Sequence, residues 1–173
     1  MDRTELFRHL SGIVRLVTGV PVCTPADDNA PAPTGSYASI EPYSSIDERG
    51  QANQRSTVST DLLNLNMSFS RQLVVRASIN FYRDNAKLYA AKLHQGNKRP
   101  DVADLLRVAG IGWSMTSAVN DLDALAGGKI EQRAQVSLTF WMEITDELTY
   151  NALLDAPMGQ ITYGDTTPEI VVN

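Results

Sequence analysis

The apolar residues of the chain follow two spacings, one typical of amphipathic helices and one typical of half-buried strands. Between residues 6 and 17 they recur every three or four positions, which predicts an opening helix. Asp2 or Thr4 is placed to cap the start of this helix, and Gly19 is placed to end it. The same spacing predicts two further helices, at residues 85–95, with Asp84 as N-cap, and at residues 101–109.

Strict alternation of apolar and polar residues predicts the strands. It is clearest at residues 130–145 and at residues 72–82, where one set of side chains faces a core and the other faces outward. Pro42 lies inside a third predicted strand, residues 36–46, and favours an edge position or a bulge there. Further strands are predicted at residues 55–68 and 113–119. A short extended segment is predicted at residues 20–25, directly after the opening helix.

The polar segments between these elements predict loops at residues 26–35 and 47–54, and a turn at residues 69–71. Residues 55–82 are then a long β-hairpin, which suits contact with a neighbouring subunit. The order of elements predicts the α+β class: a mainly antiparallel sheet, flanked by helices on one face, with a long projecting β-hairpin. Residues 120–129 are expected to form a loop.

Trp141 breaks the pattern of the strongest strand. It falls among the polar positions, opposite Leu138, Phe140 and Met142. A tryptophan on that side is either covered by a helix or used as an anchor in an interface. Both readings point to a contact surface.

Length and charge limit the function classes. The 173 residues are expected to form one domain, 1–173, and area scaling predicts that about 70% of the unfolded surface is buried. The formal charge of −5 argues against a dedicated nucleic-acid binder, since phosphate binding needs a basic surface. Cys23 is the one cysteine, so no intrachain disulfide forms. Neither a signal peptide nor a membrane-spanning segment is expected, which predicts a cytosolic site of synthesis.

Motifs for catalysis or cofactors are weak. His9 and His94 fall inside predicted helices, where a solvated helix-face histidine is the favoured reading. Acidic pairs at 27–28, 121–123 and 146–147 lack the glycine and spacing of a calcium loop, so no metal or other cofactor is predicted. A pair of carboxylates acting as acid and base stays open, since nothing singles one out.

The chain resembles the tail (neck) terminator proteins of tailed bacteriophages. The likeness depends on the order and spacing of several stretches after the amphipathic opening helix, rather than on any one motif. It covers most of residues 1–146. The stretches are residues 17–22 (VTGVPV), 32–40 (APTGSYASI), 79–86 (INFYRDNA) and 131–138 (EQRAQVSL).

The resemblance implies a structural protein of the virion, not an enzyme. Terminators form a ring, usually six-fold, that closes the head-proximal end of the tail tube and stops its growth. The implied partners are further copies of the chain, the tail tube protein and the head–tail connector or neck proteins, with the tail sheath protein as a further candidate. DNA passes through the ring without specific binding. The implied location is the tail or neck of the virion, assembled in the host cytoplasm.

Candidate contact residues follow from this reading. The alternatives that stay open are another head–tail joining component, such as a stopper or head-completion protein, and a small enzyme with carboxylate chemistry. The predicted subunit-interface residues are Trp141, Arg76, Tyr82, Met67 and Phe69, and the predicted partner-contact residues in the two loops are Asp27, Asp28, Asp47, Glu48 and Arg49.

Overall fold

The computed structural model describes residues 1–58, 64–126 and 128–151. They fall into two compact units. The first contains residues 1–53 and 70–145, and the second contains the described residues between 54 and 69 and from 146 onward. The expectation of a single domain over residues 1–173 stays a prediction.

The opening helix, α1 (Arg3–Thr18), is confirmed with both of its predicted ends. The Asp2 side chain accepts a hydrogen bond from the backbone N–H of Glu5 at 2.7 Å, as an N-cap does. Gly19 ends the helix with φ 80°, a left-handed conformation that costs glycine little. Leu6, Leu10 and Val14 form its fully buried stripe.

The second and third helices are confirmed, but one predicted cap is wrong. They are α2 (Ala86–His94) and α3 (Pro100–Val108), joined by a short 3-10 helix, η1 (Gly96–Lys98). Asn85, not Asp84, is the N-cap of α2, and its side chain makes no capping bond. The Asp84 carbonyl instead accepts a hydrogen bond from Ser36 Oγ at 2.8 Å. Arg83 and Asn85 both have positive φ, 66° and 65°, so the chain turns here through left-handed residues.

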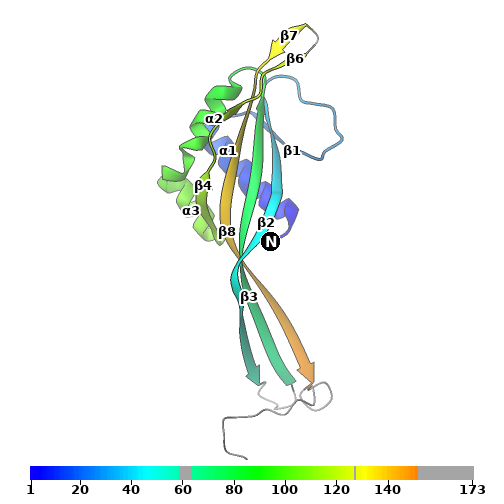
Figure 1. Ribbon diagram of the computed structural model, residues 1–173, viewed down its shortest axis with the longest axis vertical. Coiled ribbons are helices and arrows are strands. Elements are labelled where there is room, and N and C mark those ends of the chain that lie inside the picture. Colours follow the sequence, from blue (N-terminus) through cyan, green and yellow to red (C-terminus); the bar gives the residue numbers. More distant parts are fainter. Residues whose placement is uncertain (59–63, 127, 152–173) are drawn as a thin grey trace, which may run out of the picture. The chain divides into compact units, whose positions relative to one another are not determined.

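The main sheet is six-stranded and mostly antiparallel, so the α+β class is confirmed (Figure 1). Its order is β1-β2-β3-β8-β4, and β5 pairs with β8. Strands β4 and β5 pair antiparallel with β8, whereas β1 and β2 are parallel. A separate two-stranded sheet joins β6 and β7. The strands are β1 (Val22–Pro25), β2 (Tyr37–Val58), β3 (Asn64–Tyr82), β4 (Ile111–Thr116), β5 (Asn120–Asp121), β6 (Ala124–Ala126), β7 (Lys129–Glu131) and β8 (Arg133–Asn151).

Strands β3 and β8 are antiparallel neighbours, as their side-chain contacts show. Gln135 Nε2 donates to Ser78 Oγ at 2.8 Å, and further along the Ser70 hydroxyl bonds to the Glu143 carboxylate. Residue numbers therefore rise along one strand as they fall along the other, which is an antiparallel register.

The predicted loop at 47–54 and the predicted turn at 69–71 are wrong. Strand β2 runs without interruption through Asp47, Glu48 and Arg49, and β3 runs through residues 69–71. The reason is that residues 46–58 are exposed on both faces, so they lack the alternation by which a strand is recognised. The connection between β2 and β3 falls at residues 59–63, outside the described residues. The predicted loop at 120–129 holds the short strands β5 and β6.

In the core of the first unit, the buried side chains of each helix pack with every second side chain of the strands. Every second residue from Leu73 to Phe81 and from Ala134 to Met142 is buried, so these side chains lie on one face of the sheet. Ala90 of α2 and Val102 of α3 belong to the same cluster. Burying a side chain such as Phe140 contributes about 1.5–3 kcal/mol, so this face holds the unit together.

Pro42 lies where β2 has no β1 partner. The last residue of β2 that pairs with β1 is Ile40, whose carbonyl accepts a hydrogen bond from Ala26 N–H at 2.9 Å. Pro42, two residues later, faces the same edge of the strand, beyond the end of β1. Its missing N–H therefore leaves no gap in the β1–β2 ladder, which fits the predicted edge position.

Candidate assembly surface

The second face of the sheet in the first unit carries arginines and aromatic side chains. Figure 1 shows α1 passing behind β2, β3 and β8, so this outer face is the one turned away from that helix. Arg76 lies between buried neighbours on β3, and Trp141 does so on β8. Tyr82 and Arg133 lie an even number of residues away on the same two strands, so they share this face. We call Arg49, Arg76, Tyr82, Arg133 and Trp141 the arginine–aromatic face.

One end of this face is a stack of two tyrosines with an arginine on each. The rings of Tyr37 and Tyr82 lie 4.7 Å apart and nearly parallel, at 7°. The Arg133 guanidinium lies 5.0 Å from the Tyr82 ring, and that of Arg83 lies 5.6 Å from the Tyr37 ring. Burial, and then the neighbouring Tyr82, raise the pKa of Tyr37. The Tyr37 hydroxyl thus stays protonated at neutral pH.

Arg133 is held from a second direction. Its Nη2 donates to Asn80 Oδ1 at 3.3 Å on the neighbouring strand. A guanidinium that stacks on a ring and also donates to an amide keeps one orientation, since both its face and its edge are in use.

The loop at 26–35 is tied to this end of the sheet. The Arg83 guanidinium donates to the carbonyls of Pro33 and, at 3.1 Å, of Gly35. Asp28 Oδ1 accepts from Ala30 N–H at 3.0 Å. Asp27 Oδ2 lies 3.1 Å from Arg3 Nη2 at the start of α1. The predicted loop is thus confirmed as non-helical and non-strand, and its two aspartates have defined contacts.

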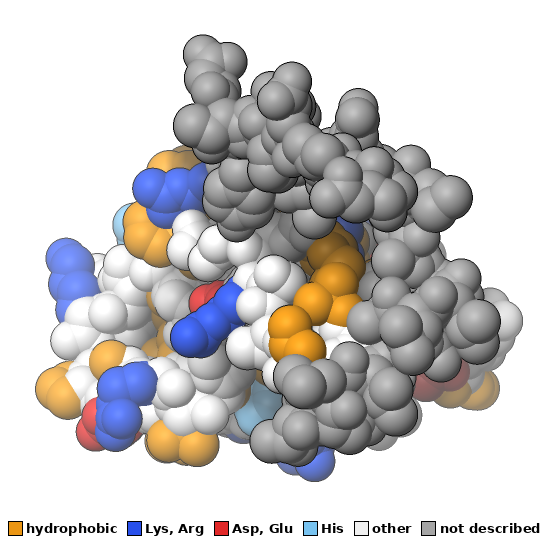
Figure 2. Space-filling model, turned by 90° about the horizontal axis from the view of Figure 1, so that it is seen from below, with side chains coloured by type: hydrophobic (Ala, Val, Ile, Leu, Met, Phe, Trp, Pro, Cys, Tyr) orange, Lys and Arg blue, Asp and Glu red, His pale blue; other side chains and the backbone are white. Residues whose placement is uncertain are grey.

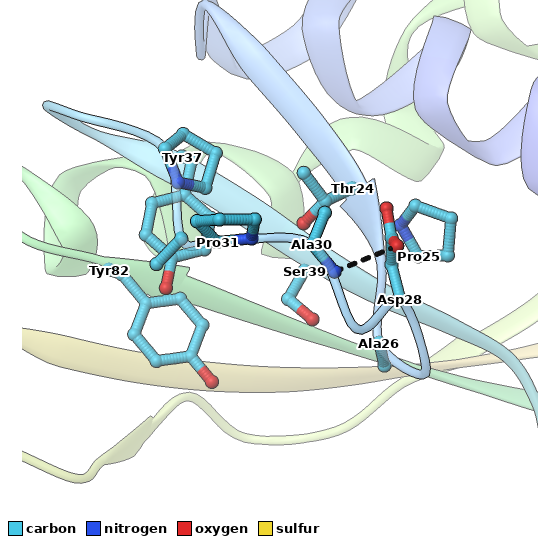
Figure 3. A pocket seen from close by; sticks show the side chains of 11 residues that line it. Thr24, Pro25, Ala26, Asp28, Ala30, Pro31, Tyr37, Ser39 and Tyr82 are labelled. Carbon is cyan, nitrogen blue, oxygen red and sulfur yellow. Dashed lines mark hydrogen bonds between the residues drawn. The ribbon is translucent and has the colours of Figure 1, made fainter.

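A cavity of about 220 Å³ lies between this loop and the tyrosines (Figure 3). Tyr37 and Tyr82 lie side by side on one side of it, and Pro31 and Ala30 of the loop lie across from them. Its polar lining groups are the Asp28 carboxyl group and four hydroxyl side chains, those of Thr24, Ser39, Tyr37 and Tyr82. Prolines of the loop also line it, and Asp28 accepts a hydrogen bond within the loop, so we interpret the cavity as the space left beneath a proline-rich loop.

The other part of the arginine–aromatic face centres on Trp141. Its side chain is 46% exposed, so the reading that a helix covers it is wrong. The Arg49 guanidinium lies 4.5 Å from its ring centroid. Gln72, Met142 and Glu143 complete an open hollow of about 340 Å³ around the pair. Arg49 was predicted on a loop, but it reaches this hollow from strand β2.

The remaining predicted residues lie apart from this hollow. Glu48, on β2, pairs with Arg71 at 3.5 Å, and Asp47 is exposed on the same strand. Met67 and Phe69 are half-buried residues of β3 in the second unit. That unit also holds a hydrogen bond from Thr149 Oγ1 to Asn66 Oδ1 at 3.1 Å.

An exposed apolar pair on the β6–β7 hairpin was missed by the sequence analysis. Leu125 and Ile130 lie directly opposite each other and are 77% and 74% exposed. The signal that could have found the hairpin is the Gly127-Gly128 pair, since adjacent glycines favour the tight turns of hairpins.

Charge and titration give no sign of a reaction site in the described part of the chain. No group of three or more His, Cys, Asp or Glu side chains is placed there to hold a metal ion. Burial raises the pKa of the Cys23 thiol, which makes it a poor nucleophile. On the face shown in Figure 2, lysines and arginines are spread among uncharged side chains rather than gathered together. Among the described helices, none is long and apolar enough to cross a membrane.

These features define a class of protein: a small α+β protein whose exposed side chains are suited to contacts with other proteins. A family model described as Phage neck terminator protein matches residues 4–167. The chain therefore belongs to the phage neck terminator protein family, which confirms the resemblance. This is a family of structural neck proteins and not of enzymes. A search of curated proteins found no match.

Proposed function

We propose that this protein forms a ring of identical subunits at the head-proximal end of a phage tail tube. The ring ends tube growth and joins the tail to the head or neck complex. The observation that supports this is the family match over residues 4–167, which spans the sheet and all three described α-helices. Six subunits are proposed, the usual number in terminator rings.

The proposed partners are other copies of the chain, the tail tube protein and the head–tail connector or neck proteins. The tail sheath protein is a further candidate where the tail contracts. The loop at 26–35 is proposed to contact one of these partners, since it is exposed and yet held by Arg83. The protein would be assembled into virions in the host cytoplasm.

DNA is proposed to pass through the ring without specific binding. Six subunits with a formal charge of −5 each would carry −30. A negative wall repels phosphate, so the genome would slide without adhering. A map of the neck that shows the channel lined by lysine and arginine would contradict this part of the proposal.

An early stop codon in the gene of the parent phage tests the proposal. We expect DNA-filled heads without joined tails, and tail tubes of irregular length, because nothing ends their growth. A plasmid copy of the full chain should restore joined tails of normal length. Tails of normal length beside heads that leak DNA would instead assign the protein to head completion, and joined particles of normal yield would contradict both roles.

A further inference from the structure

We propose that the arginine–aromatic face of one subunit binds an acidic surface on a second copy of this chain. The inference rests on the ring proposed above and names the two surfaces through which its subunits would meet. The acidic surface lies at the start of α1 and around the loop that precedes β2. We call it the acidic corner, and it consists of Asp2, Glu5, Asp27, Asp28 and Glu41.

The arginine–aromatic face has the composition of an interface centre. Binding hot spots are enriched in tryptophan, tyrosine and arginine, and lysine is depleted there. All five residues of the face are of these three enriched types. Trp141 is 46% exposed, and Arg76 is exposed further along the neighbouring strand β3, so both are open to a partner.

Two of its three guanidinium groups are already positioned. Arg49 lies 4.5 Å from the ring of Trp141, and Arg133 lies 5.0 Å from the ring of Tyr82. A side chain that is ordered before binding loses less conformational freedom when it binds, so more of the contact energy appears as affinity. The face is therefore a largely preformed surface with an excess of positive charge, three arginines against the Glu143 carboxylate in its hollow.

The acidic corner has the opposite charge. Arg3 lies at its centre, 3.1 Å from Asp27 and 2.8 Å from Glu41, and Arg8 lies 3.9 Å from Glu5. Five carboxylates thus face two guanidinium groups. The excess of negative charge is complementary to the three arginines of the arginine–aromatic face.

The charges also indicate how two copies would meet. If either surface met its own counterpart, like charges would be brought together, which costs binding energy. Contact between the two different surfaces avoids this. A contact of that kind leaves one free surface of each type on every pair of subunits, so further copies add in the same way until a ring closes.

Cross-linking in assembled particles tests the contact directly. The parent phage would carry the full chain with Cys23→Ala, Glu5→Cys and Arg76→Cys, and its virions would be treated with a short bismaleimide. We expect a ladder of covalent oligomers, because each subunit then has a reactive group on both surfaces. The matched control replaces Arg76→Cys by Arg107→Cys, since the Arg107 side chain of α3 is 77% exposed and lies outside both surfaces.

The outcomes separate this inference from the proposed function. A ladder in the control and monomers in the test virions would overturn the pairing of surfaces while leaving the ring intact. Monomers in both would also overturn the pairing. Absence of the natural chain from purified tails of the unmodified phage would instead contradict the proposed function.

Charge reversal gives a second, independent readout by sedimentation of the purified chain. Arg76→Glu and Glu5→Arg are each expected to weaken self-association ~tenfold or more, and the double variant is expected to recover most of the loss. Arg107→Glu, which makes the same charge change elsewhere, should have little effect. A double variant as weak as either single variant, or an equal loss with Arg107→Glu, would overturn the inference.

Discussion

Arg83 ties the loop at 26–35 to the end of β3 from a backbone conformation that few residues with a Cβ adopt. Its φ is 66°, and its guanidinium donates to the carbonyls of Pro33 and Gly35 while lying 3.4 Å from Glu131. Two substitutions separate the side-chain contacts from the backbone effect. Arg83→Ala removes the contacts and keeps a Cβ at positive φ, whereas Arg83→Gly removes both.

The expected magnitudes differ for the two variants. The side chain of Arg83 is 34% exposed. Its charged hydrogen bonds are therefore partly screened, and losing them in Arg83→Ala should lower the free energy of unfolding by about 2 kcal/mol. Relieving the left-handed strain gains about 1–2 kcal/mol. The extra conformational entropy of glycine in the unfolded chain offsets about 0.4–1 kcal/mol of this gain in stability. Arg83→Gly should thus be more stable than Arg83→Ala by about 0.8 kcal/mol, the difference between the two mid-values.

Urea unfolding followed by tryptophan fluorescence measures these differences, with equal m-values as the check that the unfolded states match. Limited proteolysis should cut the loop at 26–35 faster in both variants than in the natural chain. Arg107→Ala on α3 is the control and should change neither quantity. Equal stability of the two Arg83 variants would refute the account of the backbone, and unchanged cleavage would refute the role of Arg83 as the anchor of the loop.

Three further substitutions test the fold. Asp2→Ala should lower the free energy of unfolding by about 1 kcal/mol in urea, because α1 loses its N-cap. Phe140→Ala should cost about 3–5 kcal/mol and a matching fall in Tm, because the fully buried ring leaves a cavity at the centre of the sheet. Lys87 lies 2.8 Å from Asp123 and lowers the pKa of that carboxyl group. The ion pair therefore stabilises the fold at pH values above the usual carboxyl pKa, and this stabilisation is lost as the pH falls through the lowered pKa. Lys87→Ala should raise the pKa of Asp123 in an NMR titration, and an unchanged pKa would contradict the pairing.

The sequence predicted those helices and strands that bury one face and expose the other to water. The stripe of α1 and the alternation of β8 each reflect one face against the core and one against water, and such patterns can be read directly. The segment from Ile46 to Val58 is exposed on both faces, so it carries no such signal, and its residues 47–54 were predicted to form a loop. Its strand conformation comes from pairing with β3, which is a tertiary contact.

The candidate surface was predictable only in part. Trp141 stood out because it is a large aromatic residue among polar positions of a clear strand. Its partner Arg49 could not be found, because β3 lies between their two strands and the sequence does not give the register. The stack of Tyr37 on Tyr82 depends on register in the same way.

The position of β8 in the sheet makes the proposed assembly depend on the synthesis of this strand. This strand follows every other described strand along the chain, yet it lies between β3 and β4. A nascent chain that ends before residue 133 lacks the side chains of Val136, Leu138 and Phe140, so the helices have no complete surface on which to fold. It also lacks Arg133 and Trp141. Chains that stop before β8 therefore cannot present the arginine–aromatic face, and only chains translated through β8 would compete for a place in the proposed ring.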